Sequence, residues 1–165
     1  MYDIEGDLTF IQNVLKADAT VLSLLDLAGQ SLIKKANDYI TEKKTGNPSF
    51  TMSIEAACSL IIAKSIIKRS QWNDLVSSDK RLAIYPLPAR STRSEILFEQ
   101  MFEIACHVPA SEDFKARQVI GRTITIMNNT RIKGRYLRLR GLPGELPTMP
   151  GFYCFGCRFG YYDPI

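Results

Sequence analysis

The strongest constraint on the fold is a run of alternating residues between Ile96 and Val108. Apolar side chains recur there with a spacing of two on one face, at Ile96, Phe98, Phe102, Ile104, Cys106 and Val108. A period of two is typical of a β-strand. The opposite face of the same strand would carry His107 and an acidic row, Glu95, Glu99 and Glu103. The run therefore predicts one long strand around which the rest of the fold is arranged.

Apolar residues before about position 78 repeat instead at spacings of three and four, the period of amphipathic helices. We expect a first helix that starts at Asp7 and a second that is capped by Asp18 and ends near Gly29. A third would end in the basic run 43–46 and its glycine. A fourth would open at Ser53, and its many apolar residues predict burial on more than one side: Ala57, Cys58, Leu60, Ile61, Ile62 and Ala63.

The second half of the chain orders as strand, long strand, helix, strand, strand. The short strand 81–85 should break at the prolines of 86–88, a helix should start at Ser111, and further strands are expected at 134–141 and 152–162. This order predicts an α+β fold: a mostly antiparallel four-stranded sheet with helices packed on one face, plus an N-terminal helical insertion. We expect one domain over 1–165. Its helical part covers about 7–78, including an insertion at about 30–78, and its sheet part covers about 80–165.

Composition places the chain among ordinary globular domains. Of its 165 residues, 45% are apolar and 23% charged, and a domain of this size buries roughly 70% of its unfolded surface without needing disulfides. The acidic N-terminus is unlike a secretory leader, and the apolar runs are too short to span a membrane. Four cysteines are too few for a disulfide scaffold. These features favour an intracellular protein that does not enter a membrane.

Residues with catalytic or metal-binding chemistry are sparse. Cys154 and Cys157 have a metal-like spacing, but on a continuous strand residues three apart point to opposite faces and cannot share an ion. His107 follows Cys106 directly, so their side chains should also diverge. The acidic row lacks a recognisable apolar pocket that would separate the pKa values of its members. We therefore predict no catalytic residues, no cofactor and no metal site, against the alternative of a small enzyme that uses Cys106 and His107.

Five basic residues gather in a ten-residue stretch without any acid: Arg131, Lys133, Arg135, Arg138 and Arg140. With Tyr136 between them they could follow the phosphates of a nucleic acid, or they could form an inter-subunit salt-bridge surface. We favour the protein interface. The acidic row is expected to be a solvated face, a set of cross-strand partners for Arg138 and Arg140, or the acidic lining of a channel that keeps DNA from adhering.

Several segments resemble the tail terminator (tail-to-head joining) proteins of long-tailed bacteriophages. They are Lys16–Leu25, Arg81–Pro86, the helix Phe114–Met127 and the aromatic closing strand Pro150–Tyr162, and the resemblance covers 8–28 and 80–165. It implies a homo-hexameric ring that caps the tail tube, docks the head connector or neck proteins and lets DNA pass. It also implies assembly in the host cytoplasm and a place in the virion tail or neck. Because of the insertion at about 30–78, a neck or head-tail connector adaptor is an alternative, and a nucleic-acid-binding module is a second.

Contacts between subunits or with partners are expected at the basic stretch, at Glu99 and Glu103, and in the long loop 142–151. That loop contains Glu145 and Met149 and is rich in proline and glycine. Long loops of this kind are often functional. We therefore expect it to reach a neighbouring subunit or the tail tube.

Overall fold

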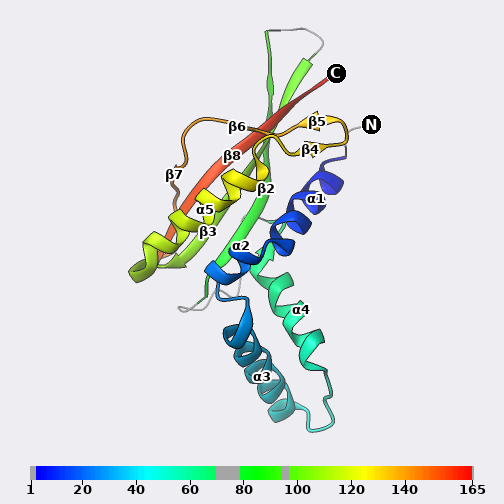
Figure 1. Ribbon diagram of the computed structural model, residues 1–165, viewed down its shortest axis with the longest axis vertical. Helices are drawn as coiled ribbons and strands as arrows, with labels where there is room; N and C mark the ends of the chain where they lie inside the picture. Colours follow the sequence, from blue (N-terminus) through cyan, green and yellow to red (C-terminus); the bar gives the residue numbers. More distant parts are fainter. Residues whose placement is uncertain (1–2, 70–78, 94–96, 165) are drawn as a thin grey trace.

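The computed structural model describes residues 3–69, 79–93 and 97–164, which form an α+β fold (Figure 1). Its main sheet has six strands in the order β1-β2-β3-β8-β6, with β7 also paired to β8. The strands are β1 (Ile66–Ile67), β2 (Arg81–Ser91), β3 (Leu97–Pro109), β6 (Arg138–Leu139), β7 (Gly144–Glu145) and β8 (Phe152–Pro164). The α+β class is confirmed. The sheet differs from the expected mostly antiparallel four-stranded one, because it has six strands and is mixed, with β1 parallel to β2.

The long strand predicted from the alternating residues is β3, paired along its whole length with β8. Ile96 and Glu95 lie outside the described residues. The neighbouring strand β2 does not break at its prolines but continues through Pro86 and Pro88. Among the described residues, β1 pairs with β2 only at Leu82 and Ala83. Proline is tolerated there because the rest of β2 is an edge strand, where a missing N–H can face away from the ladder.

The expected strand 134–141 is instead divided. β4 (Arg131–Ile132) and β5 (Arg135–Tyr136) form a separate two-stranded hairpin, and β6 joins the main sheet beside β8. Lys133 and Gly134 connect β4 to β5 with positive φ angles of 47° and 86°. Two successive positive φ angles are typical of the tight turn that matches the twist of a two-stranded hairpin.

The helices are α1 (Ile4–Ala17), α2 (Ala19–Leu24), α3 (Gly29–Gly46), α4 (Ile54–Ser65) and α5 (Asp113–Met127). Asp18 and Ser53 cap α2 and α4 as predicted, accepting hydrogen bonds from the backbone N–H of Val21 and Ala56. The predicted start at Asp7 is wrong, because Asp3 caps α1 and Asp7 is fully buried inside it. Gly29 begins α3 instead of ending α2. A short 3-10 turn, Ala110–Glu112, precedes α5 where Ser111 was expected to open it.

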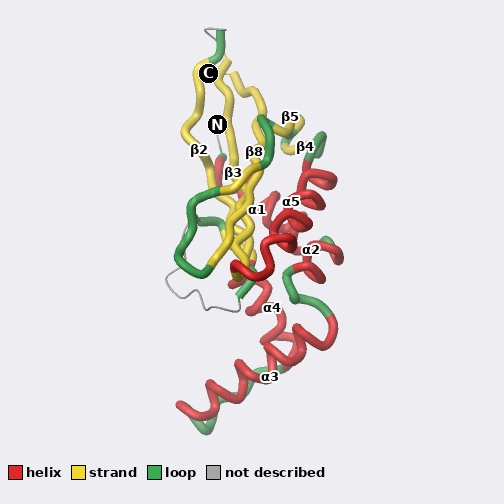
Figure 2. The backbone as a smooth tube through the Cα atoms, turned by 90° about the vertical axis from the view of Figure 1, so that its left-hand side faces the viewer, coloured by secondary structure: helices red, strands yellow, loops and turns green. Residues whose placement is uncertain are grey.

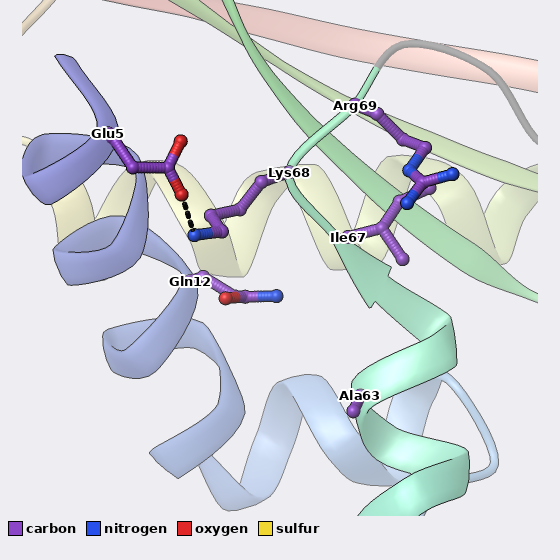
Figure 3. Close-up of a pocket in the computed structure, with 6 residues that line it drawn as sticks. All are labelled: Glu5, Gln12, Ala63, Ile67, Lys68 and Arg69. Atoms are coloured by element: carbon purple, nitrogen blue, oxygen red, sulfur yellow. Dashed lines mark hydrogen bonds and ion pairs between the residues drawn. The ribbon is translucent and has the colours of Figure 1, made fainter.

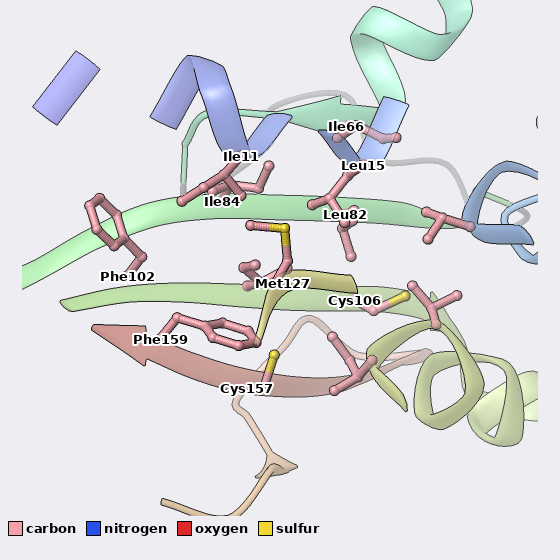
Figure 4. Close-up of a cluster of buried hydrophobic side chains, with 14 of the residues drawn as sticks. Ile11, Leu15, Ile66, Leu82, Ile84, Phe102, Cys106, Met127, Cys157 and Phe159 are labelled. Carbon is pink, nitrogen blue, oxygen red and sulfur yellow. The ribbon is translucent and has the colours of Figure 1, made fainter. Parts of the chain in front are cut away.

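Helices α1, α2 and α5 cover one face of the sheet (Figure 2). Between them and the sheet lies the main core, to which β3 contributes its even-numbered side chains (Figure 4). The fully buried residues of this core come from all these elements: Ile11, Leu15, Val21, Leu82, Ile84, Phe102, Ile104, Cys106, Val119, Ile120, Met127 and Phe159. Phe114, at the start of α5, is 51% exposed.

In its described part, 30–69, the expected insertion contains a two-helix hairpin, α3 and α4, that projects from one end of the molecule (Figures 1 and 2). Residues 70–78 lie outside the described residues. The hairpin buries only Ala36 from α3 and Ala57 from α4. The prediction that α4 is buried on more than one side is therefore wrong. The physical reason is that the helix-covered face of the sheet is already occupied by α1, α2 and α5, so α3 packs chiefly against α4.

Candidate functional site

One face of the main sheet is covered by α1, α2 and α5, and we call the opposite face the second face. The register of the strands brings polar side chains together on this second face. Near its centre, Glu103 of β3 lies opposite Tyr85 of β2 and Arg158 of β8. The Tyr85 hydroxyl donates to one carboxylate oxygen at 2.6 Å, and the Arg158 Nε donates to the other at 2.8 Å. Burial, followed by the hydrogen bond to Glu103, raises the pKa of Tyr85. Glu103 is only 6% exposed and its charge is balanced within the chain.

A second acidic residue on this face, Glu99, is neutralised in the same way. The Arg140 Nε donates to its carboxylate, and the Arg140 guanidinium lies 5.2 Å from the centroid of the Tyr162 ring. Of the alternatives for the acidic row, cross-strand pairing is thus realised at Glu99 and Glu103. The partners are Arg140, as expected, and Arg158, which replaces the expected Arg138. An acidic channel lining finds no support in these two side chains, because each carries its own counter-ion.

Further along this face, the register of β3 and β8 places His107 against Cys154. The Cys154 Sγ lies 3.5 Å from His107 Nε2, and Thr148 Oγ1 lies 2.9 Å from Nδ1. Burial lowers the pKa of His107 to about 4 and raises the pKa of Cys154 to about 12. Both groups are therefore neutral near pH 7. A thiol of this kind is not activated as a nucleophile.

The two late cysteines diverge as the sequence predicts. Cys157 lies in the main core, while Cys154 lies on the second face with Ala83 and Ala105. Cys106 is likewise buried in the main core, whereas the neighbouring His107 is on the second face. Among the described residues, no group of three His, Cys, Asp or Glu side chains could hold a metal ion.

Three of the five clustered basic residues are held in ion pairs inside the chain. Lys133 Nζ lies 2.8 Å from an Asp3 oxygen and 3.1 Å from an oxygen of the buried Asp7. Arg135 lies 3.9 Å from Asp7, and Arg140 pairs with Glu99. These ion pairs join α1 to the β4–β5 hairpin and join β3 to the segment that follows β6. Their contribution is therefore first of all to the fold.

Arg131 and Arg138 differ from the other three. Both side chains are exposed, and their guanidinium carbons lie 5.9 and 5.7 Å from the centroid of the Tyr136 ring. Arg138 also donates to the side-chain oxygen of Asn129. Neither arginine forms an ion pair with a carboxylate in the described part of the chain. We call Arg131, Tyr136 and Arg138 the arginine-tyrosine patch.

The loop 142–151 folds back on its own sheet over part of its length. Glu145 accepts hydrogen bonds from Arg117 at 3.1 Å and from Tyr153 at 3.2 Å. Leu146 packs over Gly156 beside Cys154, against the second face of the sheet. Leu142 remains 95% exposed and Met149 43% exposed. A contact from this loop to a neighbouring subunit stays a prediction, for which those two apolar side chains are the available groups.

An open hollow of about 350 Å³ lies between α1 and the end of α4 (Figure 3). Gln12, Lys68 and Arg69 line it, and Lys68 is paired with Glu5 across it. A second hollow, of about 470 Å³, lies between the α3–α4 hairpin and the start of β2 and mixes lysines with carboxylates. The second hollow is lined by Lys35 and Ser65 together with the carboxylates of Asp38 and Glu42, and burial lowers the pKa of Lys35. No helix in the described ranges is long and apolar enough to cross a membrane.

Comparison with known proteins gives no family for this chain. No family model and no curated protein matches it. One solved structure, which carries no functional name, matches 83% of this chain and 96% of its own at 15% sequence identity and a TM-score of 0.41. A likeness at this level carries no argument about function.

Sequence reasoning missed the partners that lie far apart along the chain. Asp7, Tyr162 and Arg158 were not recognised as members of polar clusters, although each contacts one of the predicted residues. Their contacts depend on the register of β3 with β8 and on where α1 crosses the sheet. The alternation of residues in β8 places Arg158 and Tyr162 on the face opposite to Phe159. This alternation is the sequence signal that could have identified Arg158 and Tyr162.

Proposed function

We propose that this chain is a structural subunit that assembles with copies of itself into a hexameric ring, in the manner of the tail terminator proteins it resembles. In this role it would cap a phage tail tube, meet the head connector and work without catalysis. The observation that carries the proposal is the α3–α4 hairpin. It stands away from the body and leaves Ile33 38% exposed and Ile54 43% exposed.

A helical hairpin that buries few apolar side chains has little stability of its own. Most helices are stabilised by packing an apolar face rather than by intrinsic propensity. Leu32, Ile61 and Ile62 pack against the main core and are partly buried. Each helix fully buries only a single alanine, and Ile33 and Ile54 face solvent. A neighbouring copy that covered this apolar surface would supply the missing packing energy.

The position of the hairpin favours a head-to-tail arrangement. It projects from one end of the molecule, and the distal part of β2 and β3 projects from the other (Figure 1). An interface that joins two different surfaces of identical chains generates a ring if the rotation closes. A subunit with unlike projections at its two ends is suited to such contacts.

The test is the oligomeric state of the full chain, measured by native mass spectrometry and light scattering with and without purified tail tube. We expect rings of the wild-type chain, at least on the tube, and loss of rings for the double variant Ile33→Glu/Ile54→Glu. Phe114→Glu, which charges an exposed apolar residue of α5, is the matched control and should still assemble. A wild-type chain that stays monomeric even with the tube, or a control that fails like the hairpin variant, would contradict the proposal.

A further inference from the structure

The arginine-tyrosine patch, Arg131, Tyr136 and Arg138, is left unused by the fold. Its two guanidiniums flank a tyrosine that is 51% exposed, and in the described structure they contact that ring and one amide oxygen but no carboxylate. Tyrosine rings attract guanidinium cations through their negative faces. The patch therefore presents two positive charges that are held in place and remain open to solvent.

The patch continues onto the main sheet. Arg138 lies opposite Gly160 of β8, and two residues further along β8 is Tyr162, which is 55% exposed and contacts Arg140. The carboxylate in this neighbourhood, Glu99, is occupied by Arg140. The described side chains of this surface are thus positive and aromatic, and the acid among them, Glu99, is already neutralised.

From this arrangement we infer that the arginine-tyrosine patch binds the phosphodiester backbone of a nucleic acid. Guanidinium groups present paired N–H donors that match phosphate oxygens. Positive side chains with neighbouring exposed aromatic residues are characteristic of surfaces that follow a nucleic acid strand. The inference is independent of the ring proposal, because it rests on different residues.

A second copy of this chain fits the patch less well than a nucleic acid does. The acidic residues within and beside α1 and α2 all pair with basic side chains of the same chain. They are Asp3, Glu5, Asp7, Asp18 and Asp26. The α3–α4 hairpin carries Asp38 and Glu42, which lie among lysines, and Glu55, which is exposed in the first turn of α4. The exposed acids Glu55 and Asp113 lie on separate helices, α4 and α5, so an identical chain offers the two arginines isolated negative charges and not a continuous row. A nucleic acid offers one phosphate for every nucleotide.

The residues of the patch have different roles in this inference. Arg131 and Arg138 contact phosphates, and Tyr136 is a positioning residue that holds both guanidiniums. Tyr136→Phe keeps the ring and should keep the affinity. Tyr136→Ala releases the guanidiniums and should lower the affinity several-fold, although the charge of the chain is unchanged. A purely electrostatic surface would not distinguish these two variants.

The experiment is fluorescence anisotropy of a short labelled DNA, single-stranded or duplex, with the full chain over a series of salt concentrations. We expect affinity to fall steeply with salt and to fall roughly tenfold or more in Arg131→Ala/Arg138→Ala. The salt slope of that variant should be shallower by about two, one for each lost phosphate contact. Lys34→Ala/Lys44→Ala removes the same charge from exposed positions on α3 and is the matched control.

Three results would overturn the inference. One is an absence of salt-dependent binding to either DNA by the wild-type chain. Another is an equal loss of affinity in the α3 control, which would mean that net charge alone is sensed. The third is displacement of DNA by polyglutamate at equal charge, which would assign the patch to an acidic protein. Native mass spectrometry of the same variants separates this outcome from the ring proposal, since the patch variants should assemble as the wild type does.

Discussion

Replacing the buried Asp7 with alanine should lower the free energy of unfolding far more than replacing an exposed acid of the same helix. Its carboxylate is fully buried, accepts a hydrogen bond from the buried Tyr161 hydroxyl and lies within ion-pair distance of Lys133 and Arg135. The contacts join α1 to β8 and to the β4–β5 turn. The variant Asp7→Ala removes all of them at once.

The size of the effect follows from what each partner does after the carboxylate is lost. Breaking a buried ion pair typically costs about 3–5 kcal/mol. The side chain of Lys133 is 45% exposed and that of Arg135 is 22% exposed, so water can solvate part of their charge. The Tyr161 hydroxyl is buried and loses a hydrogen bond to a charged group, worth about 1.5–3 kcal/mol. We therefore expect a loss of about 3 kcal/mol in the free energy of unfolding.

Urea unfolding followed by circular dichroism measures this loss, and thermal unfolding should show a drop of roughly 6–12 °C. Glu5→Ala removes an exposed ion pair with Lys68 from the same helix and should change stability by less than about 0.5 kcal/mol. In the Asp7→Ala background, Tyr161→Phe should cost less than it does in the wild-type chain, because the hydrogen bond between this hydroxyl and Asp7 is already absent. A loss below about 1 kcal/mol, or one equal to that of Glu5→Ala, would refute the reasoning.

Two further predictions concern the second face of the sheet. A Cβ atom on Gly160 would lie 2.9 Å from the backbone oxygen of Gln100. Gly160→Ala should therefore lower the free energy of unfolding, measured with urea, by about 1–3 kcal/mol. Gly144→Ala is the control and should be nearly neutral, because the space around Gly144 is open. The second prediction concerns His107, whose pKa burial lowers to about 4 in the folded chain, below the value of about 6.5 in the unfolded chain. As the pH falls, the unfolded state therefore binds the proton first. The free energy of unfolding should decrease between about pH 6.5 and about pH 4. His107→Gln should flatten the pH dependence of the unfolding free energy in that window, and an unchanged profile would count against the burial of a neutral imidazole.

The sequence predicts what depends on neighbours along the chain. The period of two in β3 and the capping side chains of Asp18 and Ser53 act over a few residues, and all three are confirmed. The divergence of Cys154 and Cys157 follows equally from strand geometry. These features need no knowledge of what packs against them.

The failures share a different physical origin, which is tertiary contact. Asp7 has the residue type and the position of a helix cap, but Tyr161 and Lys133, more than a hundred positions away, turn it into a buried charge. The helix α4 is apolar enough for a core, yet the sheet face it could cover is taken by α1, α2 and α5. Proline normally ends a strand, and Pro86 and Pro88 are accepted here because they lie in the part of β2 beyond its pairing with β1, which is an edge.

The ion pairs connect the fold to both proposals. The carboxylates on and beside α1 and α2 pair with basic side chains of α5, of the β4–β5 turn and of the segments next to β1 and β2. These pairs fix the N-terminal helices to the rest of the fold and neutralise their carboxylates. The apolar surface left over lies instead on the α3–α4 hairpin, on different elements from the arginine-tyrosine patch. Because the two surfaces share no residue, substitutions at Ile33 and Ile54 should alter assembly without changing DNA affinity, and substitutions at Arg131 and Arg138 should do the reverse.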